Sequence, residues 1–128
     1  MVFAALQRIR PPGIDLRRSG SLSLSDGFDF DFVLTDGTQT TVVETRSIRR
    51  ELIGKDIQRM SVLSEDTARY PQATLLVVAK NGFSLSAYRW VSDNSEQLTH
   101  LRKIVLVKWD GEGNDRELSE ALALSISE

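Results

Sequence analysis

Two short runs of almost entirely apolar residues, at 75–79 (Leu-Leu-Val-Val-Ala) and 104–107 (Ile-Val-Leu-Val), constrain the fold more than any other feature. A strand with apolar side chains on both of its faces must be covered on both faces, which is typical of sheets with helices packed on each side. A helical pattern precedes each run and provides the crossover that parallel strands need. The sequence therefore predicts an α/β domain whose later strands are parallel.

The part of the chain before residue 47 has a different hydrophobic period. Apolar and polar residues alternate there, as they do in strands with one buried face, and Asp26-Gly27 and Asp36-Gly37 are tight-turn signals. This pattern predicts a strand meander that includes strands at 28–33 and 40–46. Together with the apolar runs, it predicts a mixed sheet flanked by helices.

Helical periodicity predicts the covering layers. We expect a helix from Ser47, as its N-cap, to about residue 70, one or two helices from Ser84 to about residue 101, and a final helix over 116–126. Residues 1–9 fit a short helix or strand, which the Pro11-Pro12-Gly13 sequence ends. The apolar positions expected to be buried in these helices are Ile48, Leu52, Ile53, Ile57, Met60, Leu63, Leu85, Tyr88, Val91, Leu118, Leu122 and Leu124 or Ile126.

Length and composition bound the organisation of the chain. With 128 residues, we expect one domain, with residues 1–13 as an N-terminal segment and 14–126 as its core. The formal charge of -2 gives no global attraction to nucleic acid, so any polyanion site must be local. The absence of cysteine excludes disulfides and thiolate sites. No segment reaches the length of a membrane span, and we expect a cytoplasmic protein.

Charged side chains recur at alternate positions of the two expected strands. Asp29 and Asp31 share one strand face, as do Glu44 and Arg46. If these faces coincide, carboxylates from neighbouring strands converge on one hard cation such as magnesium, with a guanidinium nearby for phosphate charge. The alternative is that these four residues form the solvated face of an amphipathic sheet.

The same residues resemble the motifs of the PD-(D/E)xK nuclease superfamily, and within it the Mrr-like restriction endonuclease domains. Gly27-Phe28-Asp29 is similar to the family's Gly-hydrophobic-Asp step, and Glu44-Thr45-Arg46 to its acidic-x-lysine step. Downstream, Asn81-Gly-Phe-Ser-Leu-Ser-Ala87 and the strand at 104–107 with Asp110-Gly111 continue the likeness. The resemblance covers residues 14 to 126 and implies a restriction-endonuclease-like fold.

The resemblance implies roles for individual residues. Asp29 and Glu44 would hold Mg²⁺ or Mn²⁺. Asp31, which the family pattern does not require, is an additional candidate ligand. Arg46 stands in place of the family's catalytic lysine; it can offset phosphate charge, but it is a poor proton donor or acceptor.

Four basic residues follow the proposed site in the chain: Arg49, Arg50, Lys55 and Arg59. They would give the first long helix a surface that tracks a DNA backbone. The alternative is a solvated helix face that pairs with Glu51 and Asp56.

Three hypotheses for function remain open at this level. The first is a magnesium-dependent deoxyribonuclease that acts on DNA as a homodimer or with a partner subunit. The second is a catalytically inactive nuclease-like domain that binds nucleic acid or serves protein assembly. The third is an unrelated α/β protein.

Overall fold

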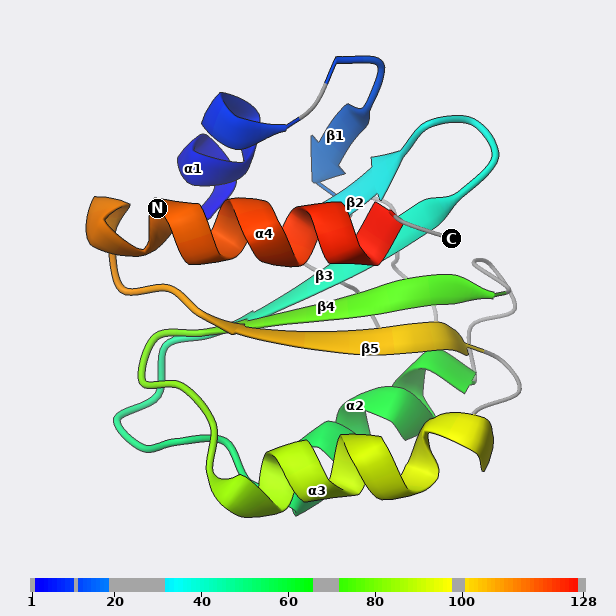
Figure 1. Cartoon of the computed structure of the whole chain (residues 1–128), viewed down its shortest axis with the longest axis vertical. Helices are drawn as coiled ribbons and strands as arrows, with labels where there is room; N and C mark the ends of the chain where they lie inside the picture. Colours follow the sequence, from blue (N-terminus) through cyan, green and yellow to red (C-terminus); the bar gives the residue numbers. More distant parts are fainter. Residues whose placement is uncertain (1, 11, 19–31, 66–71, 98–100, 127–128) are drawn as a thin grey trace.

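The computed structural model describes residues 2–10, 12–18, 32–65, 72–97 and 101–126 (Figure 1). These residues form helices on both sides of one sheet. The helices are α1 (Val2–Ile9), α2 (Gly54–Glu65), α3 (Leu85–Asn94) and α4 (Asp115–Ile126), with short 3-10 turns η1 (Ser95–Gln97) and η2 (Glu112–Asn114). The strands are β1 (Asp15–Arg18), β2 (Phe32–Thr35), β3 (Thr40–Arg46), β4 (Ala73–Ala79) and β5 (Leu101–Lys108).

The sheet has five strands in the order β1-β2-β3-β4-β5. Its first part is an antiparallel meander, because β1 pairs with β2 and β2 with β3 in opposite directions. Its second part is parallel, since helical crossovers bring β4 alongside β3 and β5 alongside β4. The predicted α/β fold with a mixed sheet flanked by helices is therefore confirmed.

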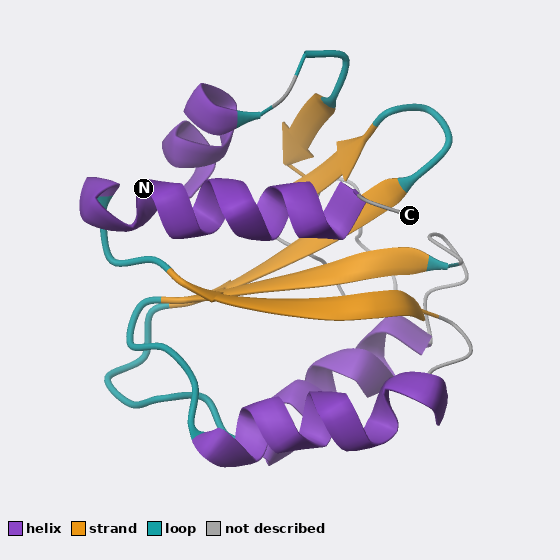
Figure 2. Cartoon of the chain, viewed as in Figure 1, coloured by secondary structure: helices purple, strands orange, loops and turns teal. Residues whose placement is uncertain are grey.

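Two helical layers cover the sheet, α1 and α4 on one face and α2 and α3 on the other (Figure 2). Strand β4 is buried along its whole length. Its side chains alternate between the layers: Leu75 and Val77 belong to the core under α2 and α3, whereas Leu76 and Val78 belong to the core under α1 and α4. Burying a leucine side chain completely contributes about 1.5–3 kcal/mol, so this strand anchors both layers.

The N-terminal segment contributes to the core under α1 and α4. Ala5 and Leu6 of α1 have no exposed surface and pack with α4 residues such as Leu118 and Leu122. Helix α1 thus helps to cover the sheet.

The hairpin between β2 and β3 has the turn that Asp36-Gly37 predicts. The Asp36 carboxylate accepts hydrogen bonds from the backbone N–H groups of Gln39 at 2.7 Å and Thr38 at 2.8 Å, and these bonds lower its pKa. Gly37 has a φ of 97°, which a residue with a side chain rarely adopts.

The predicted start of the first long helix at Ser47 is wrong, because α2 begins at Gly54. The backbone of the preceding residues bonds elsewhere: the Leu52 N–H donates to the Gly82 carbonyl at 3.0 Å, and the Leu52 carbonyl accepts from the Ser84 N–H at 2.8 Å. Leu52 is buried as expected, but Ile48 and Ile53, which flank this bridge, are exposed.

The segment expected to form one or two helices contains α3, which ends at Asn94, and then η1, and β5 starts at Leu101. The expected burial is wrong at two positions of α3. Leu85 and Tyr88 of α3 are 64% and 51% exposed because Ala87 and the neighbouring Val91 provide its packed face. In α4, Leu118 and Leu122 are buried as predicted, whereas Leu124 is exposed.

Some predictions fall outside the described residues. They are the Asp26-Gly27 turn and the strand positions before Phe32. Among the described helices, none is both long enough and apolar enough to cross a membrane.

Candidate functional site

The carboxyl-terminal half of β3 orients Glu44 and Arg46 toward one side of the sheet. Side chains alternate along a strand, so both project to the same side as Val42, which lies in the core under α2 and α3. The prediction that these two residues share a strand face is consistent with this register, and Val43 faces the opposite layer.

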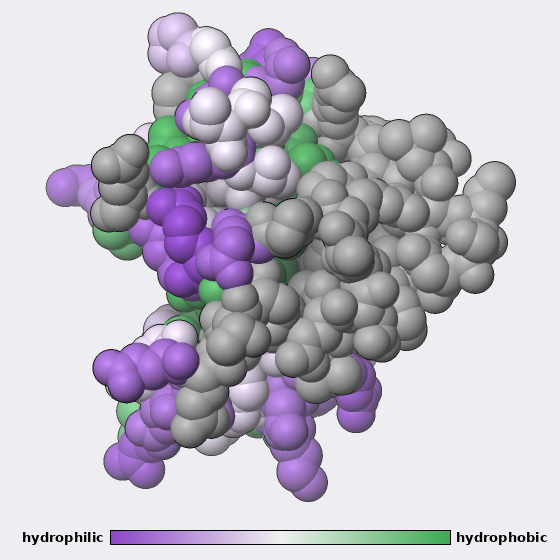
Figure 3. All heavy atoms as spheres, turned by 90° about the vertical axis from the view of Figure 1, so that its right-hand side faces the viewer, coloured by the Kyte–Doolittle hydropathy of each residue, from purple (hydrophilic) through white to green (hydrophobic). Residues whose placement is uncertain are grey.

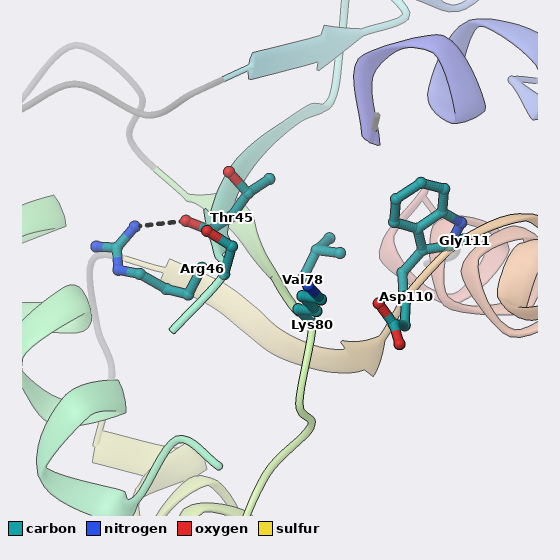
Figure 4. A pocket seen from close by; sticks show the side chains of 8 residues that line it. Thr45, Arg46, Val78, Lys80, Asp110 and Gly111 are labelled. Carbon is teal, nitrogen blue, oxygen red and sulfur yellow. Dashed lines mark hydrogen bonds between the residues drawn. The ribbon is translucent and has the colours of Figure 1, made fainter. Parts of the chain in front are cut away.

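Glu44 and Arg46 form an ion pair in a largely buried setting. An Arg46 guanidinium nitrogen, Nη1, lies 2.7 Å from Glu44 Oε2. The same nitrogen donates to the Thr45 carbonyl at 2.8 Å (Figure 4). Glu44 is only 8% exposed, while the Arg46 side chain keeps 35% of its surface accessible. A buried carboxylate needs a cation or hydrogen-bond donors close by, and the guanidinium meets that need here.

The other predicted metal ligands, Asp29 and Asp31, lie outside the described residues. Within the part of the chain that the structure describes, no three His, Cys, Asp or Glu side chains are grouped so that they could hold a metal ion. Glu44 is therefore the one member of the predicted ligand set whose surroundings are described.

The predicted basic surface is divided between a loop and a helix. Arg49 and Arg50 lie in the connection from β3 to α2, and Lys55 and Arg59 lie on α2. All four are exposed. The expected continuous helical surface is thus wrong for the first two residues, because the helix starts later.

Arg50 forms a double hydrogen bond with Asp56, at 2.8 and 3.2 Å. This contact raises the pKa of Arg50, and it is the main reason that the pKa of Asp56 is lowered. Asp56 also accepts the Ile53 backbone N–H at 2.8 Å. Since α2 starts one residue after Ile53, Asp56 reaches back as in a capping box. Of the two readings of the basic residues, a DNA-tracking surface or pairing with acidic neighbours, the structure shows pairing for Arg50.

A cavity that the sequence analysis did not anticipate opens where the parallel strands β3, β4 and β5 end. It has a volume of about 390 Å³. Its lining consists of Thr45, Arg46, Ser47, Val78, Lys80, Trp109, Asp110 and Gly111. A signal was present in the sequence: Lys80 directly follows one apolar run and Asp110 closely follows the other, and ligands of open α/β sheets bind outside the carboxyl ends of strands.

This cavity shares Arg46 with the Glu44 site, but it also reaches the opposite layer of the molecule. Val78 and Trp109 belong to the layer of α1 and α4, opposite to the side on which Glu44 lies. Figure 4 shows the Arg46 guanidinium extending away from Asp110, so this residue borders the cavity without directing its charged group into it.

The structure has a second cavity and a hydrophilic face. A second cavity of about 540 Å³ lies between α2 and α3, and Lys55 and Gln58 contribute to its lining together with Arg89 and Trp90. On the face of the molecule that Figure 3 shows, the described surface is mostly hydrophilic, with smaller apolar areas.

Comparisons with known proteins bear on the fold. No family model and no curated protein matches this chain. Among solved structures, it is similar to the crystal structure of a protein of unknown function, AF1548, with a TM-score of 0.61 and 15% sequence identity. The match covers 93% of this chain and 61% of that one. At this identity the likeness shows a shared fold.

Proposed function

We propose that this chain is a magnesium-dependent deoxyribonuclease of the PD-(D/E)xK type. Glu44 would hold the divalent cation together with Asp29 and Asp31, and Arg46 would stabilise charge that develops on the phosphate. When bound, magnesium supplies Lewis-acid chemistry, polarising a phosphoryl oxygen and acidifying a water molecule.

The burial of Glu44 is the observation that carries this proposal. Side chains on the solvated face of an amphipathic sheet are exposed, whereas Glu44 is 8% exposed. A carboxylate oxygen is also the donor type that Mg²⁺ prefers. The ion pair with Arg46 supports the fit, because it is direct evidence that this position attracts positive charge.

Arg46 is suited to charge stabilisation and unsuited to proton transfer. A guanidinium is a poor proton donor or acceptor, and its planar fork matches phosphate oxygens. About a third of its side-chain surface is accessible, at 35%, so a phosphate can approach it. In this proposal, Arg46 binds the scissile phosphate and orients it beside the Glu44 carboxylate.

The exposed cations after β3 support DNA as the substrate. Arg49, Lys55 and Arg59 would neutralise backbone phosphates, a sequence-independent source of affinity that decreases with salt. Arg50 would contribute less, since Asp56 already engages its guanidinium. A cytoplasmic location, and action as a homodimer or with a partner subunit, belong to the same proposal.

Incubation of pure protein with supercoiled plasmid and Mg²⁺ or Mn²⁺ tests the proposal. We expect nicked or linear product with the wild type, and we expect Glu44→Gln to reduce cleavage to the level seen in EDTA. Glu51→Gln is a matched control, because Glu51 is exposed and lies outside the proposed site. Equal cleavage by wild type and Glu44→Gln would show that a contaminating nuclease is responsible.

One observation favours a second candidate, a non-catalytic nucleic-acid-binding or assembly module. The Arg46 guanidinium is bonded to the very carboxylate that the metal would need, so it can serve as a permanent substitute for the cation. Calorimetry with magnesium separates the candidates. DNA binding with no measurable magnesium binding favours the module, whereas tight magnesium binding that Asp29→Asn abolishes rejects it.

A further inference from the structure

The cavity at the carboxyl ends of β3, β4 and β5 has a rigid frame. The Lys80 backbone N–H donates to the Arg46 carbonyl at 2.9 Å, and the Trp109 backbone N–H donates to the Ala79 carbonyl at 3.1 Å. These bonds extend the parallel ladder beyond the last residues of the strands. They hold Lys80 and Trp109 at fixed positions on the rim.

The orientation of the Trp109 ring is fixed as well. Its indole Nε1–H donates to Asp115 Oδ1 at 2.8 Å, and Asp115 also pairs with Arg8 of α1. Trp109 is partly buried against the core under α1 and α4 and lines the cavity at the same time. A preoriented aromatic side chain that borders a cavity can stack on a planar ligand at a low cost in conformational entropy.

Two opposite charges stand on the rim. Lys80 and Asp110 are exposed, and neither forms an ion pair with any other described residue. The buried Val78 adds apolar surface to the lining. A fitting ligand therefore combines an anionic group, a flat apolar ring and a hydrogen-bond donor.

We infer that this cavity binds a single nucleotide as a 5′-monophosphate. The base would stack on Trp109, the phosphate would bind Lys80 and the Ser47 hydroxyl, and an exocyclic amino group of the base would donate to Asp110. The volume of about 390 Å³ is in the range of small-ligand sites. This assignment goes beyond the proposed nuclease activity, because the cavity reaches the layer opposite to Glu44 and needs no metal.

Tryptophan fluorescence tests the inference directly. The chain has two tryptophans, so a Trp90→Phe variant leaves Trp109 as the reporter. This variant is titrated in EDTA with dAMP, dCMP, dTMP, deoxyribose 5-phosphate and inorganic phosphate, with excitation at the red edge of the tryptophan band. We expect saturable quenching by the nucleotides, and weaker binding of dTMP, which lacks an exocyclic amino group.

Substitutions on the rim define the contacts. Lys80→Met should weaken dAMP binding roughly tenfold, the effect of losing one charged hydrogen bond. Asp110→Asn should remove the preference of dAMP and dCMP over dTMP. Lys108→Met is the matched control: Lys108 is exposed at the same end of the sheet and is not among the residues that line the cavity, so this variant should bind dAMP as tightly as wild type.

Three results would overturn the inference. They are no saturable change in fluorescence, an equal affinity of the Lys80→Met variant, and inorganic phosphate binding as tightly as dAMP, which would indicate a simple anion site. Because metal is absent, a failed plasmid cleavage assay leaves this test unaffected. Quenching by nucleotides in Glu44→Gln would show in turn that the two sites are independent.

Discussion

The Glu44 carboxylate forms an ion pair with Arg46, and this pair affects how a cation enters the site. A guanidinium 2.7 Å from Glu44 Oε2 and a divalent cation would share the same negative charge. Each therefore reduces the electrostatic gain available to the other. The affinity of the site for magnesium depends on how readily Arg46 turns toward a phosphate.

We predict that Arg46→Met makes stability depend on metal. Without the guanidinium, a carboxylate that is 8% exposed lacks its cation, so the variant should unfold at a lower temperature than wild type in EDTA. Manganese should restore more of the lost stability than it adds to wild type. Thermal unfolding with and without Mn²⁺ measures this, and Arg49→Met, which changes an exposed arginine, is the control. If Mn²⁺ raised the unfolding temperature of wild type, Arg46→Met and Arg49→Met by the same amount, Arg46 would not compete with the metal for Glu44.

For single residues, the sequence predicts the strand face on which a side chain lies better than it predicts how buried that side chain is. Period-two alternation is enough to place Glu44 and Arg46 on one face, because it follows from strand geometry alone. The near-complete burial of Glu44 and the rim formed by Lys80 and Asp110 depend on the register of three strands that are distant in sequence. The exposure of Leu85 and Tyr88 differs from the prediction for a similar reason, since the packed face of α3 depends on elements distant in sequence.

The start of α2 shows how a local contact decides the bounds of an element. Asp56 accepts the Ile53 N–H and holds Arg50, so the loop before the helix is tied to its first turn. Ser47 has the chemistry of an N-cap, but the Leu52 bridge to residues 82 and 84 keeps the backbone extended until Gly54. Sequence periodicity cannot reveal a pairing between segments about 30 residues apart, which explains the misplaced start.

We predict that Asp56→Asn destabilises the protein by about 1 kcal/mol at neutral pH, the typical loss for a helix cap. The pKa of Asp56 is lowered in the folded state, so its contribution is complete above the ordinary carboxyl pKa of 3.8 and is lost as the pH falls through the lower, folded-state value. Urea unfolding at pH 7 and near pH 2 gives the free energy of unfolding of wild type and of Asp56→Asn. Asp93→Asn on α3 is the control, and a difference that persists unchanged in acid would refute the role of the charge.

Asp115 joins three elements, because the first residue of α4 holds both Trp109 and Arg8 of α1. We predict that Asp115→Asn loosens α1 and shifts Trp109 emission to the red, with faster amide exchange in α1 than in wild type. Since these bonds, led by that from Trp109, lower the pKa of Asp115, the wild type should approach the variant as the pH falls below 3.8. Glu117→Gln, an exposed change on the same helix, should leave emission and exchange unchanged.

The molecule as a whole is a sheet between two helical layers, and β4 joins both cores. We predict that Leu75→Ala and Leu76→Ala each cost about 2–5 kcal/mol, as is usual for leucine truncation in a core. Both should shift one common transition, because the layers share the strand. Trp90 reports on the α2 and α3 layer and Trp109 on the other, so single-tryptophan variants can follow each layer. Two transitions that move separately would show that the layers unfold independently.

The architecture could be predicted from the sequence to a large extent. Apolar runs, helical crossovers and the Asp36-Gly37 turn determine a mixed sheet with helices on both faces, because each reflects a local rule. The chemistry could be predicted less well. Glu44 and Arg46 follow from strand alternation, whereas the cavity between Thr45, Lys80 and Asp110 exists only after three strands end side by side.

Electron paramagnetic resonance of Mn²⁺ shows whether Glu44 holds a divalent cation. We expect saturable binding of Mn²⁺ to the wild type, competition by Mg²⁺, loss of binding in Glu44→Gln and retention in Glu51→Gln. Binding that is absent from the wild type, or that remains equal in Glu44→Gln, would contradict this expectation.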